Sequence, residues 1–378
     1  MDFRLSEEQQ QFSESLKRWI ERDYSFEDRK KIIYSDSGIS DKAFAALNEI
    51  GAIPLGVPED AGGLGGTSED LMVVMQELGR GLVIEPYFST VLACDFLHRG
   101  GGHKEILADV ATGTVKLACA LSEKKSGHEL FNITTSAKKD SDGYVINGAK
   151  CAVIHGSQAN GLVVSTRTSG DVRGESGITL FYVPSGTAGV KAIDFRTYDG
   201  QRAANIEFND VRVPASARIG SEGKGWDILE AATDFGITLL CSEAVGAMES
   251  ANAQTLEYLK TRKQFGVPIG TFQVLQHRMA DMVIHAQQAK SITILAAVKV
   301  NQVSAEERRK LVSAAKVRVG QAARFVGQQA IQMHGGMGMT NEMPISHYFK
   351  RLTAIEMTLG NTDFHRNRFI KQPGFSVA

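Results

Sequence analysis

The chain has 378 residues, of which 43% are hydrophobic, so its length predicts two or three units with ample apolar core. Charged residues of both signs make up 22% and leave a formal net charge of -1, which gives no field that would favour nucleic acid or an anionic membrane surface. No apolar stretch reaches membrane-spanning length, and the segment MDFRLSEEQQ lacks the basic start and apolar run of an export signal. We therefore expect a cytoplasmic protein without nucleic-acid or membrane partners.

The cysteines and histidines argue against disulfides and metal sites. Cys94, Cys119, Cys151 and Cys241 are far apart and form no CxxC pair, so reduced, packed thiols are expected. The nine histidines show no close spacing with other metal ligands. The sequence therefore predicts no bound metal.

Residues 1–114 have a helical pattern. Apolar positions recur at intervals of three and four, as in Phe12, Leu16, Trp19 and Ile20. Residues 115–220 contain short alternating segments with turn pairs such as Asp142-Gly143 and Asn147-Gly148. These patterns predict an all-helical N-terminal domain followed by a small β domain.

Helical periodicity returns in residues 221–378. Ser304 and Glu307 have capping-box spacing before a long helix that is expected to run toward Met333. Four long helices packed as a bundle would account for this part of the chain. The overall prediction is an α+β chain of three domains.

One constellation indicates a site for a phosphate-bearing cofactor. It consists of the stretch LKTRKQFGVPIGTFQVLQHRMAD, residues 259–281, together with Gln332, Gly335 and Gly336. The guanidinium of Arg262 can engage a pyrophosphate with two hydrogen bonds, and glycines let backbone amides approach phosphate or ribose. Either motif alone would fit a surface charge or a helix stop, but the two together at this spacing favour a binding site.

These segments, in this order, resemble the acyl-CoA dehydrogenase family over nearly the whole chain. The resemblance is carried by residues 50–66, 121–127, 144–150, 262–276 and 335–351. It implies an N-terminal helical domain, a middle β-barrel or sandwich, a C-terminal four-helix bundle, and FAD as the cofactor. In that family the residues at the places of Arg262, Phe265, Gln332, Gly335 and Gly336 contact the FAD of a neighbouring subunit.

The same resemblance exposes a missing catalytic base. Members of the family remove the α-proton of an acyl-CoA thioester with a carboxylate while hydride leaves for the flavin. The usual position of that carboxylate falls here on Leu359, and the alternative position falls on Gly236. Glu243 and Glu356 lie nearby on other helical phases and are expected to be solvated or paired helix carboxylates. No catalytic residue is therefore predicted.

The β domain departs from the family pattern as well. The positions that contact the flavin in relatives carry Ala152 and Ile154, where the family has Trp and Thr. The preceding motif reads SEKKSGHE, in which Ser122 keeps the hydroxyl of the family pattern. The proline of the family motif is replaced here by Lys124, the serine by His128 and the aspartate by Glu129. His128 is expected to be a loop histidine that faces solvent.

The losses fall on the chain's own active site, while the residues lent to a neighbour remain. The sequence therefore predicts the small, base-less subunit of a two-component acyl-CoA dehydrogenase, with a larger subunit as partner in a heterotetramer. The resemblance implies an acyl-CoA substrate and an electron-transfer flavoprotein as acceptor. Two alternatives stay open: a self-sufficient flavoenzyme that needs no base, as in the desulfinase branch, and a non-catalytic binding member of the family.

Overall fold

The computed structural model describes residues 5–374 and divides into two compact units. The first unit comprises residues 1–29, 68–83 and 237–378, and the second comprises residues 30–67 and 84–236. Helix α2 (Phe26–Ile33) and the 36-residue helix α8 (Trp226–Thr261) contribute to both units. Each unit is described by itself.

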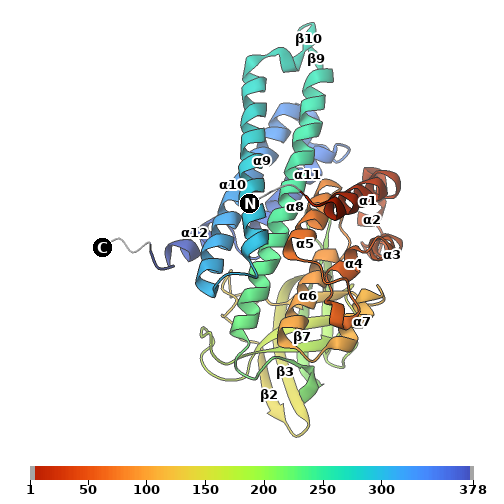
Figure 1. Ribbon diagram of the computed structural model, residues 1–378. Helices are drawn as coiled ribbons and strands as arrows, with labels where there is room; N and C mark the ends of the chain where they lie inside the picture. Colours follow the sequence, from red (N-terminus) through yellow and green to blue (C-terminus); the bar gives the residue numbers. More distant parts are fainter. Residues whose placement is uncertain (1–4, 375–378) are drawn as a thin grey trace. The chain divides into compact units, whose positions relative to one another are not determined.

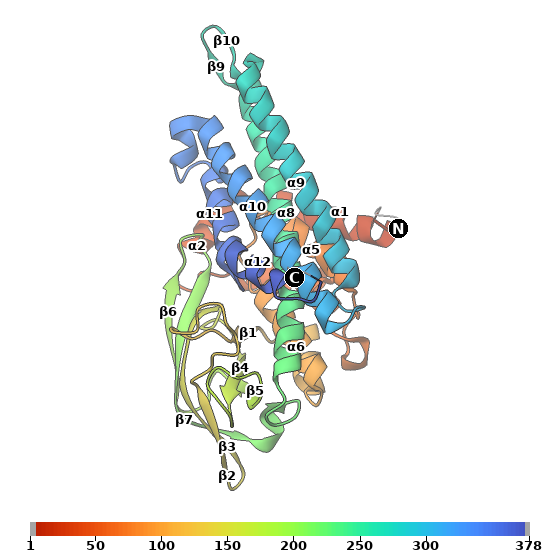
Figure 2. The ribbon, with the colours of Figure 1, turned by 90° about the vertical axis from the view of Figure 1, so that its left-hand side faces the viewer.

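The first unit is a helical bundle (Figures 1 and 2). Its elements are α1 (Glu7–Asp23), α5 (Ser68–Arg80), α8 from residue 237, α9 (Gln273–Lys299), α10 (Ala305–His334), α11 (Pro344–Met357) and α12 (Thr362–Ile370). Helix α10 packs against α9, α11 and α12, and α5 packs against α1 and α9. The hairpin of β9 (Lys263–Gln264) and β10 (Val267–Pro268) joins α8 to the 3-10 turn η3 (Ile269–Thr271) and α9.

Capping and small residues explain why these helices begin and pack where they do. Ser304 accepts a hydrogen bond from the Glu307 backbone N–H at 3.3 Å, so the expected long helix begins at this cap and ends at His334. Helices α5 and α8 pack backbone to backbone. A Cβ on Gly246 would lie 1.8 Å from the Gln76 carbonyl oxygen, and one on Gly79 would lie 2.0 Å from that of Glu243.

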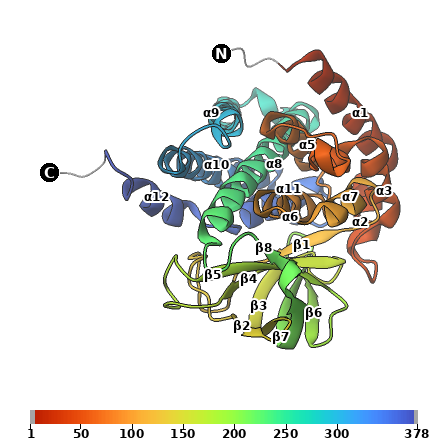
Figure 3. The same ribbon diagram turned by 60° about the horizontal axis from the view of Figure 1, so that its bottom comes forward.

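The second unit combines a sheet with short helices (Figure 3). Its helical elements are α3 (Asp41–Glu49), α4 (Ala52–Leu55), η1 (Glu59–Ala61), α6 (Tyr87–Gly100), α7 (Lys104–Ala111) and η2 (Ala215–Ala217). Its strands are β1 (Leu117–Ala120), β2 (Ser136–Asp140), β3 (Gly143–Ile154), β4 (Gly161–Arg167), β5 (Ile178–Pro184), β6 (Val190–Arg196), β7 (Arg202–Pro214) and β8 (Arg218–Ile219). Helix α6 packs against β1.

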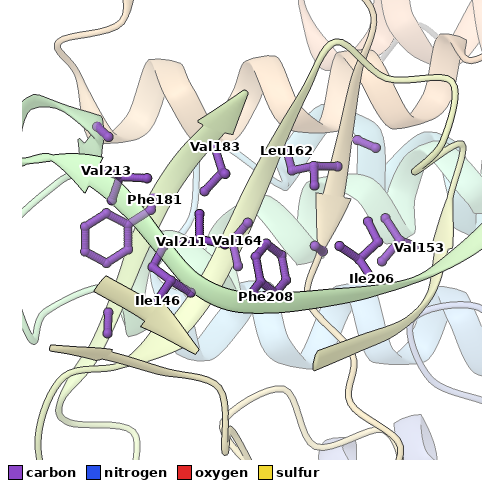
Figure 4. Packing of buried hydrophobic residues seen from close by; sticks show 14 of the residues in the cluster. Ile146, Val153, Leu162, Val164, Phe181, Val183, Ile206, Phe208, Val211 and Val213 are labelled. Atoms are coloured by element: carbon purple, nitrogen blue, oxygen red, sulfur yellow. The ribbon is translucent and has the colours of Figure 1, made fainter. Parts of the chain in front are cut away.

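The sheet has the strand order β6-β7-β3-β2-β4-β5-β8, and β1 pairs with β4 in parallel. It curls around one apolar core in which Ile146, Phe181, Ile206 and Phe208 are no more than 1% exposed (Figure 4). The expected middle β domain is therefore a single sheet wrapped around its own core. Strand β4 is buried along its whole length because it lies in the interior of this sheet.

One of the two predicted turn pairs was wrong. The chain does turn between Asp140 and Gly143, which pair across β2 and β3. Asn147 and Gly148 instead lie inside β3, where the register against β7 shifts between Ile146 and Gly148. An Asn-Gly pair supplies the unusual backbone angles of a β-bulge as readily as those of a turn, and flanking strand pairing decides between them.

The helix, sheet, helix order of the α+β prediction is confirmed. The predicted domain boundaries at residues 114 and 220 stay predictions.

The free cysteines are all unpaired thiols, and burial raises the pKa of Cys94, Cys119 and Cys241.

Candidate functional site

Arg262 follows the last residue of α8 and starts a tight hairpin. Its backbone N–H donates to the Tyr258 carbonyl at 2.9 Å, and its carbonyl accepts from the Ile269 N–H at 2.8 Å. The backbone is thereby fixed, while the side chain is exposed and makes no hydrogen bond or ion pair within residues 5–374. The guanidinium of Arg262 is therefore an exposed positive charge whose N–H groups are available to a ligand.

Phe265 stands at the tip of this hairpin. The two-residue turn consists of Phe265 and Gly266, both with positive φ, of 54° and 80°. This pattern matches the twist of paired strands, but it favours asparagine or glycine at the first position. The Phe265 side chain is 92% exposed and meets Phe272 edge-on at 6.1 Å. An exposed aromatic side chain on a strained backbone is typical of a residue that takes part in binding.

Helix α10 ends near the same end of the bundle (Figures 1 and 2). Gln332 lies on its exposed face, and Gly335 ends it with a φ of +60°. Gly335 and Gly336 are both exposed, and a Cβ added to either would meet no atom within 4 Å. We call Arg262, Phe265, Gln332, Gly335 and Gly336 the bundle-end site.

The donor set of the bundle-end site fits a dinucleotide such as FAD. A guanidinium supplies a planar pair of donors for a pyrophosphate, and a carboxamide can bond a ribose or base. Open space over two glycines lets a ligand reach the backbone. An exposed aromatic ring offers a flat apolar contact. The site contains no titratable carboxylate, so it can bind an anion but cannot abstract a proton.

Leu359, the residue that the sequence resemblance aligns with the usual base, lies on a turn fixed by hydrogen bonds. Leu359 has a φ of +55°, and its carbonyl oxygen accepts from His365 Nε2 at 2.9 Å. The Nζ of Lys316 donates to the carbonyl oxygens of Ile355, Glu356 and Thr358 at 2.6, 3.1 and 2.8 Å. Burial lowers the pKa of Lys316 to about 8. Two buried side chains thus hold a turn that carries no proton acceptor.

The nearby carboxylates are engaged elsewhere. Glu243 pairs with both arms of the Arg351 guanidinium at 2.5 and 2.7 Å, and both side chains are buried. Glu356 accepts from the Thr362 backbone N–H at 3.0 Å and is 6% exposed. They are paired, as expected, but buried rather than solvated. Gly236 lies buried within α8 and offers no side chain.

A second polar cluster lies inside the β domain. Lys150 Nζ donates to Glu123 Oε1 at 2.9 Å, to the Leu121 carbonyl at 3.1 Å and to Ser165 Oγ at 3.0 Å. Burial alone would raise the pKa of Glu123, but the Lys150 cation and the hydrogen bonds from Thr134 and Thr135 outweigh burial and set this pKa at about 2. The sequence analysis did not predict the pairing of Glu123 with Lys150. The only sequence signal for it was a glutamate and a lysine that flank apolar strand segments.

The residues that the sequence resemblance aligns with flavin contacts lie on β3 and in the loop before β2. Ala152 is exposed at a second bulge, with a φ of +51°, and its N–H donates to Asn205 Oδ1 at 3.2 Å. Ile154 is half-buried at the end of the strand. His128 is half-buried in the loop before β2, not fully exposed as expected, and Glu129 beside it is also half-buried. Neither Ala152 nor Ile154 can donate or accept through its side chain.

Within residues 5–374, no three His, Cys, Asp or Glu side chains gather as ligands for a metal ion. No helix in the same residues is both long enough and apolar enough to cross a membrane.

The fold defines a class: a chain with a helical domain, a sheet domain and a second helical domain, in that order. Family models match in the same order. The N-terminal, middle and C-terminal domains of acyl-CoA dehydrogenase match residues 6–113, 118–211 and 223–372. The chain belongs to the acyl-CoA dehydrogenase family.

Known proteins similar to this chain span almost all of it. A probable acyl-CoA dehydrogenase of Bacillus subtilis, YngJ, is 28% identical over 376 residues, which cover 97% of this chain and 98% of YngJ. The FAD complex of PigA matches with a TM-score of 0.89 and 25% identity, over 99% of this chain and 100% of PigA. A steroid acyl-CoA dehydrogenase named Tcur3481-Tcur3483 matches with a TM-score of 0.86 and 26% identity, over 96% of each chain.

Proposed function

We propose that this chain is the cofactor-completing subunit of a two-component, FAD-dependent acyl-CoA dehydrogenase. The observation that carries the proposal is the contrast between two sites. Arg262, Phe265 and the exposed glycines form an intact anion-binding edge, while the turn at Leu359 is rigid and lacks a base. When bound, FAD accepts the hydride; this chain's residues bind its anionic part and hold its position.

Sharing a cofactor requires a partner chain on the bundle, and an apolar face supports this. A groove of about 800 Å³ lies between the end of α8, η3 and α9. Its lining is mainly apolar and includes Leu256, Leu259, Pro268, Met279, Val283 and Ile284. Val283 and Ile284 are 42% and 52% exposed, so this surface gains from being covered.

The partner that fits best is a larger family member with its own base and flavin pocket. A solved relative named with two components, Tcur3481-Tcur3483, supports pairing of unlike chains. The combination YLKTRKQFGVPIGTFQVLQH and HYFKRLT resembles the small subunit of pimeloyl-CoA dehydrogenase, and this resemblance is part of the proposal. A heterotetramer, an acyl-CoA substrate, an electron-transfer flavoprotein as acceptor and a cytoplasmic location belong to the same proposal.

The test is to replace Arg262 in the complex of this chain with its larger subunit. We expect Arg262→Ala to weaken FAD binding tenfold or more, because a charge-assisted hydrogen bond contributes roughly 1.5 to 3 kcal/mol. Flavin retained after dialysis at low concentration is the measurement. Arg262→Lys keeps the charge but loses the fork and should give an intermediate loss.

The matched control is Arg173→Ala, which removes an equal charge from an exposed loop of the β domain. Unchanged flavin content in Arg262→Ala would show that Arg262 is not at a shared site. The chain purified alone decides between the proposal and self-sufficiency. Stoichiometric flavin and robust acyl-CoA oxidation by the homogeneous chain would overturn the proposal.

A further inference from the structure

Two aromatic residues join the helix ends that carry the bundle-end site. The rings of Tyr258 on α8 and His334 on α10 are stacked, with centroids 4.3 Å apart and planes at 25°. The Tyr258 hydroxyl donates to the His334 backbone carbonyl at 3.4 Å. Tyr258 is one helical turn before Arg262, and His334 directly precedes Gly335.

His334 is fixed on its own helix as well. It is 3% exposed, and its Nδ1 lies 2.8 Å from the Ala330 carbonyl oxygen, so this nitrogen carries the proton. Burial lowers the pKa of His334, which keeps the imidazole neutral near neutral pH. The hydrogen bond at Nδ1 and the stacking contact with Tyr258 together fix the orientation of this neutral, buried ring.

We propose that Tyr258 and His334 are positioning residues that lock the ends of α8 and α10 together, so that Arg262 and the Gly335-Gly336 backbone engage one dinucleotide at once. The proposal rests on the proposed function, because it assigns the pair to the same shared FAD. Neither residue is assigned a contact with the cofactor. They act by fixing the separation of two groups that would otherwise move with separate helix ends.

The first arm of the test uses the chain alone and measures backbone hydrogen exchange. Tyr258→Leu should speed exchange in residues 262–270 and in residues 335–340, because both segments depend on the same stack. The control, His285→Leu, removes an equally close stack on Phe325, with centroids 4.2 Å apart, between α9 and α10. It should leave both segments unchanged. Unaltered exchange in Tyr258→Leu would overturn the proposal.

The second arm titrates FAD into the apo two-subunit complex. Tyr258→Leu should raise the Kd for FAD roughly three- to tenfold when Arg262 is present, and by much less in the Arg262→Ala background, because coupled residues are not additive. His334→Phe keeps a stacking ring and should restore most of the affinity lost in His334→Leu. Additive effects of Tyr258→Leu and Arg262→Ala would mean that the pair only stabilises the bundle.

The two arms separate failure of this proposal from failure of the shared site. If Arg262→Ala leaves FAD affinity unchanged, the proposed function is wrong, and the exchange experiment still decides whether the pair orders both segments. If Arg262→Ala weakens FAD binding and Tyr258→Leu does not, only the positioning role is wrong.

Discussion

Leu359 combines a left-handed backbone with an apolar side chain, a combination that glycine or asparagine would adopt with less strain. The strain persists because the surrounding turn is held by Lys316 and His365, which together bond the carbonyl oxygens before and at residue 359. These hydrogen bonds fix the backbone of the turn at residues 358 and 359. Under the proposed function, residue 359 is the position at which this chain lacks the base.

Under the proposed function, Leu359→Glu in this chain should not create a second working site, because the side chains of Ala152 and Ile154 can neither donate nor accept a hydrogen bond. A base acts only when substrate carbon and hydride acceptor are held beside it. The assay is activity of a complex whose larger subunit carries Gln in place of its own catalytic Glu. Recovery of a substantial fraction of activity would show that this chain holds a competent flavin pocket.

At the scale of elements, the contact between α5 and α8 depends on glycine at the crossing. Gly246→Ala should destabilise the protein by roughly 1 to 3 kcal/mol, because the new Cβ would lie 1.8 Å from the Gln76 carbonyl oxygen, a backbone atom that cannot move alone. The better helix propensity of alanine, worth about 1 kcal/mol, offsets only part of this cost. Urea unfolding measures the difference.

Gly186→Ala is the control for this substitution. Its Cβ would meet no atom within 4 Å, and its backbone does not require a positive φ. Equal stability of Gly246→Ala and the unmodified protein would show that the two helices can separate without loss.

Elements with strong periodicity or clear caps were predictable from sequence. The cap at Ser304 and the helical spacing of Leu16 and Trp19 are local signals, and the structure contains both helices. The bulge at Gly148 was not predictable, because the choice between turn and bulge depends on pairing with β7, which is distant in sequence. The stacking of Tyr258 on His334 was not predictable for the same reason, because the two residues are distant in sequence.

The candidate site divides in the same way. The residues of the bundle-end site were predicted from motifs, and the structure shows all five exposed at helix ends or in the hairpin. What motifs could not indicate is the support behind them. Lys316 sits in the apolar run SAAKVRV, and only tertiary structure shows that its ammonium reaches three carbonyl oxygens of α11 and the following turn.

For the whole molecule, acid should be more destabilising than mild alkali. The folded pKa of Glu123 is about 2 against a usual value of 4.5, so its contribution is present above pH 4.5 and is lost as the pH falls toward 2. Burial also lowers the pKa of His103 and His334 and, for the half-buried His285, partial burial does the same, so the folded protein loses stability as the pH falls below 6.5. The glutamate and the histidines therefore both lower the free energy of unfolding as the pH falls.

Glu123→Gln tests this assignment. At pH 7 it should cost about 3 kcal/mol, because it leaves the Lys150 cation buried without its partner. The gap to the unmodified protein should shrink as the pH falls toward 2, where Glu123 itself is protonated. Unfolding midpoints between pH 7 and pH 2.5 measure it, with the exposed Glu175→Gln as control. A gap that stays constant over this range would contradict the assignment.

The hairpin tip offers a built-in reporter of assembly. Phe265 is 92% exposed on a two-residue turn, so in the free chain a protease that cuts after aromatic residues meets an open peptide bond there. A subunit that covers the tip with its cofactor and surface removes that bond from reach. The rate of cleavage at this one position, followed as partner is added, would then read out complex formation without any enzymatic turnover.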